Sequence, residues 1–242
     1  NGSNARTYEL FLSRGIPFDY VIATDDYLLE RPIRSVQSLR IAPGERVEVV
    51  LDFSRYPTGA EIFLENHLEQ FDGRKPAGLA SSGTPILKFI VGDAVGDPSV
   101  VPDQLRPLIL GPAQLLPLVR TRRIFEFGRS GGVWVVNGEL FDENRIDARP
   151  KIGVPEIWTL KSGGGWLHPV HIHLASFFIL SRNGKSPPLL ERGRKDLVRI
   201  GADEGDVDIL IRFTGFTGRY VFHCHTIEHE DMRMMGQFEV QP

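Results

Sequence analysis

The feature that most constrains this sequence is the clustering of its metal-ligating side chains. Of the seven histidines in 242 residues, six fall within two short windows, residues 168–173 and 223–229. The only cysteine, Cys224, lies in the second window. Imidazole and thiolate are ligands that suit copper and zinc. Scattered core histidines would not cluster in this way, so the sequence predicts a fold that brings the two windows together as a metal centre.

The parity of side chains along a β-strand separates these ligands into two groups, because successive side chains point to opposite faces. In the second window Cys224 takes one face, and both histidines that flank it take the other. In the first window His168 has the opposite parity to the two histidines that follow. One face then carries four imidazoles, those of His171, His173, His223 and His225. The other carries Cys224 and His168, with His229 and a methionine supplied by the following turn.

Each predicted environment has a chemical meaning. Two histidines, one cysteine and a weak axial methionine form a blue-copper electron-transfer site. All three methionines of the chain lie at positions 232, 234 and 235, close to this cysteine. The four-imidazole face suits copper ions that bind dioxygen. Since His223, Cys224 and His225 are consecutive, a few covalent bonds would join the two environments and provide an electron path.

Short apolar runs separated by 25 glycines and 17 prolines favour an all-β protein with many turns. The strands expected in the first part are Tyr8–Leu12, Tyr20–Thr24, Arg46–Phe53, Glu61–Glu65 and Ile86–Val91. Those expected later are Arg123–Phe127, Val133–Val136, Glu156–Leu160, Val170–His173, Phe177–Ser181, Val207–Phe213, Arg219–Cys224 and Gln237–Val240. One helical turn is expected at Thr226–Met235.

These strands predict three segments. Residues 1–92 hold too few strands for a complete sandwich. Residues 93–122 contain five prolines in about thirty residues, which predicts an extended linker on the surface. Residues 123–242 hold eight short strands, which predict a complete Greek-key sandwich.

Charge and hydropathy exclude some partners. The net charge of −3 does not favour nucleic acid or an anionic membrane. No apolar run approaches the roughly 18 residues that a membrane span requires. A single cysteine excludes an intrachain disulfide.

The two windows resemble the C-terminal signature of multicopper oxidases of the laccase, spore-coat laccase and bilirubin oxidase type. They read His-Pro-x-His-x-His from His168, and His-Cys-His-x3-His-x4-Met from His223. The segment Ala42–Phe53 resembles the second cupredoxin domain of these oxidases. The resemblance implies a partial second cupredoxin domain at residues 1–92 and, after the linker, a copper-binding C-terminal cupredoxin domain at 123–242.

The resemblance also implies a role for each ligand. Type 1 copper would bind His168, Cys224 and His229, with Met234 as the axial ligand. Type 2 copper would bind His171, and the type 3 pair would bind His173, His223 and His225. Glu230 matches an acidic residue that supplies protons during oxygen reduction in some relatives. Met232 and Met235 do not fit the spacing and are expected to pack.

The implied enzyme is an oxidoreductase with dioxygen as acceptor. A phenol, aromatic amine, bilirubin-like compound or metal ion would give single electrons to type 1 copper through an exposed edge of His229. Cys224 would pass them on, and four electrons would reduce dioxygen to water at a trinuclear site. The family places this chemistry outside the cytoplasm, in the periplasm, the spore coat or the medium.

The trinuclear site of the family needs eight imidazoles. This chain offers four, and its only other histidine is His67, which we expect at the surface. The sequence therefore predicts that an N-terminal portion of the same oxidase, missing here or present as a second chain, completes the cluster.

Two alternatives stay open from the sequence. A blue-copper electron carrier would need no oxygen chemistry, although it would have no use for His223 and His225. A nitrite reductase would link type 1 to type 2 copper, but would not need four imidazoles on one face. The number of bound copper ions distinguishes these three readings.

Overall fold

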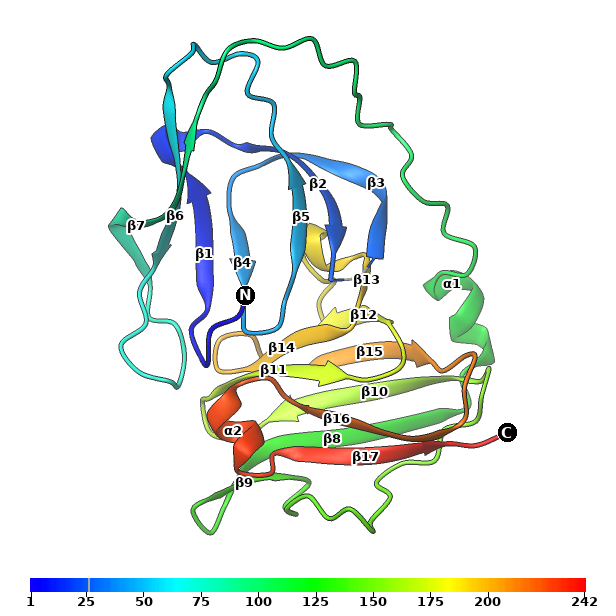
Figure 1. Cartoon of the computed structure of the whole chain (residues 1–242). Coiled ribbons are helices and arrows are strands. Elements are labelled where there is room, and N and C mark those ends of the chain that lie inside the picture. The colour runs from blue at the N-terminus through cyan, green and yellow to red at the C-terminus, as the bar shows by residue number, and fades with distance from the viewer. Residues whose placement is uncertain (26) are drawn as a thin grey trace.

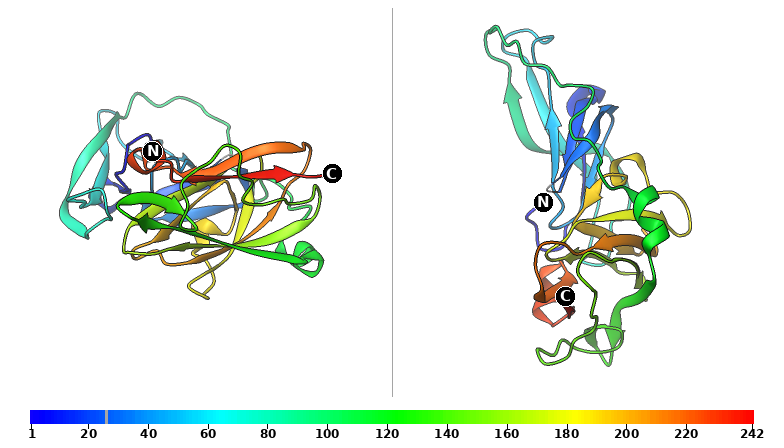
Figure 2. Two further views of the ribbon diagram at one scale, coloured as in Figure 1. Left: turned by 90° about the horizontal axis from the view of Figure 1, so that it is seen from below. Right: turned by 90° about the vertical axis from the view of Figure 1, so that its right-hand side faces the viewer.

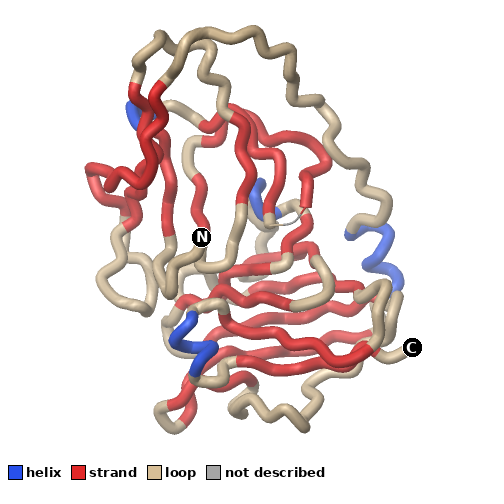
Figure 3. Tube along the Cα trace, viewed as in Figure 1, coloured by secondary structure: helices blue, strands red, loops and turns tan. Residues whose placement is uncertain are grey.

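The computed structural model describes residues 1–25 and 27–242, and most of its regular structure is β-strand (Figure 1 and Figure 3). The predicted all-β class is therefore confirmed. The first unit, in blue to cyan in Figure 1, contains a four-stranded sheet of order β4-β1-β6-β7 and a three-stranded sheet of order β3-β2-β5. Its strands are β1 (Tyr8–Leu12), β2 (Phe18–Thr24), β3 (Tyr27–Val36), β4 (Leu39–Ile41), β5 (Val47–Val50), β6 (Glu61–Leu68) and β7 (Leu79–Ile90).

The second unit contains a six-stranded sheet of order β13-β12-β15-β10-β8-β9 and a four-stranded sheet of order β14-β11-β16-β17. Its strands are β8 (Thr121–Ser130), β9 (Val133–Val136), β10 (Pro155–Ser162), β11 (Leu167–Ile172), β12 (Phe177–Arg182), β13 (Arg194–Lys195), β14 (Leu197–Gly201), β15 (Val207–Arg212), β16 (Gly218–Cys224) and β17 (Met235–Val240). Between the two sheets lies one apolar core, centred on Trp158, Phe125 and Phe222, which are almost completely buried. Cys224 belongs to this core.

The segment between the units runs along the outside of the molecule, as both Figure 1 and the right-hand view of Figure 2 show. Residues 91–111 contain no helix or strand. The segment ends in the short helix α1 (Pro112–Leu115), where the side chain of Gln114 accepts a hydrogen bond from the backbone N–H of Gly111. The exact boundaries at residues 92 and 122 stay predictions. Among the described residues, no helix is long and apolar enough to cross a membrane.

Strands that the sequence did not predict have identifiable reasons. The unpredicted strand β3 contains Pro32 and several charges, and it lies at the edge of its sheet, where a proline does not interrupt the hydrogen-bonded ladder. In β14 every residue is buried, but Arg199 breaks the apolar pattern. The helix after β16 is α2 (Ile227–Asp231), which is shorter than the predicted Thr226–Met235.

A buried cluster of charged side chains joins the two units. From the first unit, the Glu45 carboxylate forms ion pairs with Arg199 and, at 3.2 Å, with Lys195 of the second. Lys195 also lies 3.1 Å from Asp25. Arg199 in turn contacts Glu191 at 2.8 Å, and all five residues are buried. Because charges in such a place are stable only when paired, this cluster fixes how the first unit sits on β13 and β14.

We predict that Arg199→Met lowers the free energy of unfolding by about 3–5 kcal/mol, because it removes one buried cation from the carboxylates of Glu45 and Glu191 and leaves excess negative charge in the cluster. The matched control is Lys88→Met, which breaks the exposed Lys88–Glu61 pair of 2.8 Å. That control should cost no more than about 1 kcal/mol. Urea denaturation of both variants measures the difference, and equal losses would contradict the role of the buried cluster.

Acid should weaken the same junction. Burial alone would raise the pKa of Glu45, but Arg199, Lys195 and the backbone N–H of Ala42 outweigh it and lower the pKa from 4.5 to about 2. As the pH falls, the Glu45 carboxylate therefore takes up a proton in the unfolded chain before it does so in the folded chain. Above pH 4.5 the ionised Glu45 makes its full contribution to the free energy of unfolding, on the order of 3 kcal/mol. This contribution is lost as the pH falls towards 2. Urea titrations at several pH values in this window should show a smaller pH dependence for Glu45→Gln than for the wild type; an unchanged dependence would refute the assignment.

Candidate metal centre

The pairing of β11 with β16 brings the two histidine windows together. The register places Val170 opposite Cys224 and His171 opposite His223. Cys224 therefore shares a face with Val170 and His168 and points into the core between the sheets. The side chains of His171 and His223 point to the other face of the same sheet. The structure thus divides the ligands between two faces in the way that strand parity predicts.

On the inner face, three ligand atoms form a nearly regular triangle. The Nδ1 atoms of His168 and His229 are 3.1 Å apart, and the Sγ of Cys224 lies 3.6 Å and 3.5 Å from them. The centre of this triangle is about 2.0 Å from each atom, which is close to the length of a bond from a metal to an imidazole nitrogen. The three residues are at most 2% exposed. A single metal ion therefore fits among them without displacing any side chain far.

Burial sets the protonation of this triad. Loss of solvation lowers the pKa of His168 to about 3 and that of His229 to about 4, so both imidazoles are neutral at pH 7. Burial also raises the pKa of the Cys224 thiol to about 12. The buried Nε2 of His168 has no hydrogen-bond partner among the described residues. This buried set of groups suits a metal ion, because such an ion binds neutral imidazoles and takes the place of the thiol proton.

Met234 lies beside the triad. Its side chain is completely buried in the same core as Cys224. Its backbone carbonyl accepts a hydrogen bond from the N–H of Cys224 at 3.2 Å, and its own N–H donates to the carbonyl of His229 at 3.0 Å. Met232, by contrast, is 54% exposed, and Met235 lies opposite His223 in β17. Met234 is thus the methionine whose backbone is bonded to two members of the triad.

The short helix α2 places His229. The carbonyl of Thr226 accepts hydrogen bonds from the N–H groups of His229 and Glu230, both at 3.0 Å, and closes the turn that follows Cys224. The N–H of Thr226 points to the Cys224 Sγ, 3.5 Å away. The turn therefore supplies one candidate ligand and also a hydrogen bond to the sulfur of another.

Trp134 and Trp166 cover His229, so less of its ring is exposed than expected from the sequence. The ring of Trp134 lies 3.8 Å from that of His229 between centroids, and the ring of Trp166 lies 5.6 Å away. His229 keeps 2% of its surface exposed, so the expected exposed edge is reduced to a small part of the ring. That part opens on a cleft of about 600 Å³ whose lining includes both indoles, Arg74 and Arg129.

The four remaining predicted imidazoles gather on the outer face. The ring centroids of His171 lie 4.8 Å from His173, 5.6 Å from His223 and 6.2 Å from His225. The Nε2 atoms of His173 and His223 are 3.2 Å apart. Loss of solvation lowers the pKa of His171, His173 and His223, which favours the neutral forms that bind metals.

Glu230, a residue of α2, lies next to this outer cluster. Its Oε1 is 3.4 Å from the Nδ1 of His223, and its side chain is 33% exposed. A carboxylate that is both near a cluster imidazole and open to solvent can exchange protons between the two. His67, in contrast, lies on β6 and contacts Phe11 and Glu65, apart from the imidazole cluster.

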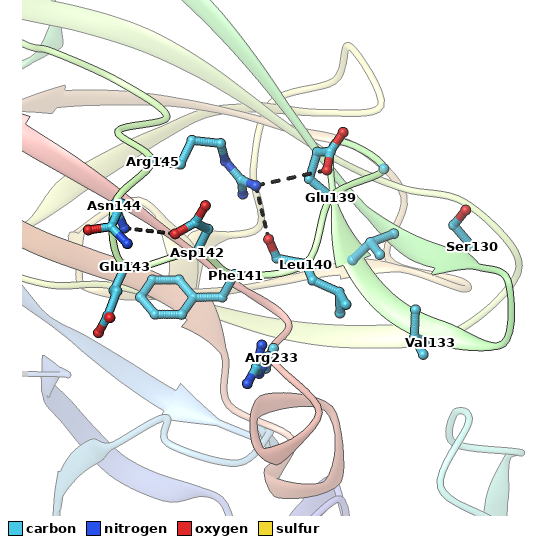
Figure 4. Close-up of a pocket in the computed structure, with 12 residues that line it drawn as sticks. Ser130, Val133, Glu139, Leu140, Phe141, Asp142, Glu143, Asn144, Arg145 and Arg233 are labelled. Carbon is cyan, nitrogen blue, oxygen red and sulfur yellow. Dashed lines mark hydrogen bonds and ion pairs between the residues drawn. The ribbon is translucent and has the colours of Figure 1, made fainter.

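A larger surface pocket, of about 750 Å³, lies elsewhere, at the β8–β9 hairpin and the loop after it (Figure 4). In this pocket Arg145 donates a hydrogen bond to the Leu140 carbonyl at 3.0 Å and lies 4.0 Å from the Glu139 carboxylate. None of the eight predicted metal ligands is among the described residues that line it. The size of a pocket therefore does not identify the candidate site in this protein.

Sequence reasoning did not identify two contributors to the site. The role of Trp134 could not be read from its strand, because the contact with His229 depends on the packing of β9 against α2. Asp196 was not identified either, although its backbone carbonyl accepts a 2.8 Å hydrogen bond from the Nδ1 of His171. Neither residue has a local sequence signal of its function.

Comparison with known proteins agrees with this geometry. A family model described as multicopper oxidase matches residues 116–242. A bilirubin oxidase from Albifimbria verrucaria is 39% identical over 232 residues, which cover 92% of this chain and 39% of the relative. A laccase from Bacillus subtilis is 30% identical over 269 residues, which cover 99% of this chain and 49% of the relative. The chain thus spans about half the length, or less, of these curated relatives.

Solved structures agree as well. A laccase-like multi-copper oxidase from Ochrobactrum sp. superimposes on the whole chain with a TM-score of 0.80 at 34% identity, over 54% of its own length. A multicopper oxidase from Aquifex aeolicus gives a TM-score of 0.84 at 25% identity, also over 54% of its length. These likenesses confirm the predicted cupredoxin class of the fold.

Burial of Cys224 leads to a prediction for the metal-free protein. A thiol that is inaccessible and has a pKa of about 12 should resist a thiol reagent such as dithionitrobenzoate at pH 8. We expect labelling at least about a hundredfold slower in the native chain than in 6 M guanidinium, because thiolate is the reacting form. Rapid stoichiometric labelling of native protein, with unfolding excluded by circular dichroism, would show that the triad is open to solvent.

Proposed function

Since the chain belongs to the multicopper oxidase family, we propose that it is the C-terminal part of a laccase-type enzyme that oxidises a reducing substrate and reduces dioxygen to water. Copper, when bound, supplies the one-electron chemistry at one site and the four-electron reduction of dioxygen at the other. The observation that carries the proposal is the placement of two ligand sets on opposite faces of one strand pair. The residues of each set have distinct tasks.

The inner triad would hold type 1 copper. His168, Cys224 and His229 offer three atoms at mutual distances of 3.1–3.6 Å, and Met234, buried in the same core, would be the weak fourth ligand. This donor set is the one that blue-copper sites use. Burial excludes water and keeps the ligand number low, and the N–H of Thr226 donates to the cysteine sulfur.

The outer imidazoles would hold half of the trinuclear site. His171 would be the type 2 ligand, and His173, His223 and His225 would bind the type 3 pair. The four other imidazoles of the family would come from an N-terminal portion of the same oxidase, as a further segment or as a second chain. That portion is the main protein partner in this proposal.

The peptide itself would connect the two sites. Cys224 is bonded directly to His223 and His225, so an electron that leaves the sulfur reaches either imidazole through one residue of chain. The carbonyl of Cys224 also lies 3.1 Å from the Nδ1 of His223, which offers a shorter path across space. A pure electron carrier would have no use for these connections, which is why we favour an oxidase.

The cleft beside His229 is the proposed entry for electrons. Because the Trp134 ring lies against His229, with centroids 3.8 Å apart and planes tilted by 36°, a donor in the cleft would contact this indole as well as the small exposed part of the imidazole. Phenols, aromatic amines, bilirubin-like compounds and metal ions are the proposed donors, and dioxygen is the acceptor. An extracytoplasmic location, in the periplasm, the spore coat or the medium, is part of the same proposal.

Glu230 is the proposed proton donor. Its Oε1 lies within 3.4 Å of the outer cluster, and the exposed part of its side chain can take up protons from water. Reduction of dioxygen to water consumes protons at this face, so a carboxyl group that holds a proton there and is recharged from solvent would support turnover.

We predict that the purified chain, loaded with copper, shows the intense blue absorption and narrow copper hyperfine splitting of a cysteine-ligated site. Cys224→Ser should abolish both signals, because the thiolate is the source of the colour. Met234→Leu should keep the blue colour with a higher reduction potential, because a weak ligand is lost. His67→Gln, which removes the histidine outside the candidate site, should match the wild type in all these measurements.

Counting copper on the same samples separates the alternatives. One copper per chain with no outer-face copper would favour an electron carrier. Additional copper that Cys224→Ser retains, and that shows no blue band, would support oxygen chemistry on the outer face. A wild-type chain that binds copper without any blue band would contradict the proposed type 1 site.

A further inference from the structure

The outer imidazole cluster borders a turn of the first unit. This turn, residues 42–46, runs from β4 to β5 and approaches two of the four imidazoles. At Gly44, where φ is +82°, an added Cβ would lie 2.5 Å from the Cδ2 of His225 and 2.6 Å from the Cδ1 of Leu197. A side chain at this position would displace the His225 ring, so the backbone of the turn serves as one wall of the cluster.

Arg46, at the end of the turn, reaches the other imidazole indirectly. Its Nη1 and Nη2 donate to the Oδ1 and Oδ2 of Asp196 at 2.8 Å and 2.7 Å, in the bidentate geometry that gives strong and directional pairs. Nη1 also donates to the carbonyl of Gly44 at 2.9 Å. A single guanidinium group therefore fixes the turn and the Asp196 carboxylate relative to each other.

Asp196 is the residue that orients His171. Its backbone carbonyl accepts a hydrogen bond from the His171 Nδ1 at 2.8 Å, while its carboxylate Oδ1 lies farther away, at 3.7 Å. The N–H of Asp196 donates to the Asp25 carboxylate at 3.2 Å, which holds the carbonyl in place. With the proton on Nδ1, the Nε2 of His171 keeps a free lone pair for a metal.

We infer that Arg46 is a positioning residue for the outer cluster: by holding Asp196 in place, it keeps the Nδ1–H of His171 on the Asp196 backbone carbonyl and so fixes the orientation of this ring and of its free Nε2. The inference rests on the proposed function only where it concerns copper, because the hydrogen bond of the His171 Nδ1 is a property of the metal-free chain. Without Arg46, the Asp196 carboxylate is free to rotate towards the Nδ1 of His171 and to compete with the backbone carbonyl for its proton, which would turn the ring without changing its tautomer, since both groups are acceptors.

The exposure of Arg46 separates this role from plain stability. Its side chain is 39% exposed, in contrast to those of Lys195 and Arg199, at 4% and 9%. An ion pair that water can reach contributes little to folding. Removing Arg46 should therefore disturb the geometry of His171 much more than the stability of the chain.

The test is a comparison of ¹⁵N-labelled, metal-free chains by long-range ¹H–¹⁵N spectra of the histidine rings. In the wild type, His171 should show one neutral tautomer, protonated at Nδ1. In Arg46→Met the tautomer should stay the same, but the signals of Nδ1 and its proton should shift because the acceptor changes, and Arg46→Lys should restore the wild-type signals only in part. Arg34→Met, which breaks the exposed Arg34–Asp103 pair of the same unit, is the matched control and should leave His171 unchanged.

Copper binding gives the second readout. Arg46→Met should weaken copper binding at the outer face by roughly tenfold or more, as is typical when a partner of a ligand histidine is lost, and leave the blue band of the inner site unchanged. Should Arg46→Met fail to fold, Arg46→Lys, which keeps the charge but loses the bidentate pair, provides the same comparison.

Two outcomes distinguish this inference from the proposed function. If the wild type binds no outer-face copper but the Nδ1–H signal of His171 still depends on Arg46, the proposed oxygen chemistry fails and the positioning role stands. If Arg46→Met folds and keeps both the wild-type Nδ1–H signal and the wild-type copper affinity, the positioning role is wrong whatever the activity of the enzyme.

Discussion

The whole site depends on the register between β11 and β16. Because side chains alternate across a strand, a slip of one residue would send Cys224 to the outer face and the histidines beside it into the core. The observed pairing of Val170 with Cys224, and of His171 with His223, gives each group of ligands its own environment. The inner one is dry and small, and the outer one is wider and partly open. One strand pair therefore places the two proposed metal sites a single residue apart.

The first unit contributes to the site although it supplies none of the eight predicted ligands. Its 42–46 turn places Gly44 against His225, Glu45 in the buried charge cluster and Arg46 on Asp196. The same short segment thus fixes the junction between the units and shapes the outer face. In the proposed account, a change in this segment would alter metal binding in the second unit without touching a candidate ligand.

The sequence predicted the all-β class, most strands and the division of the ligands between two faces, because histidine spacing and strand parity are local signals. It did not predict β14, since Arg199 interrupts its apolar pattern and the pairing partner that buries the strand is distant in the chain. The burial of His229 under Trp134 and the link from Arg46 to His171 were also missed. Such contacts arise from tertiary packing of segments separated by up to 150 residues, which no local pattern encodes.

The central claim is that copper binds on both faces of one strand pair, with Cys224 on the inner face. Anomalous diffraction at the copper edge, from crystals of the copper-loaded chain, tests it most directly. The account predicts one strong peak about 2 Å from the Nδ1 atoms of His168 and His229 and from the Cys224 sulfur, with further copper beside the outer imidazoles. Copper found only outside the triad, with the Cys224 sulfur unligated, would contradict it.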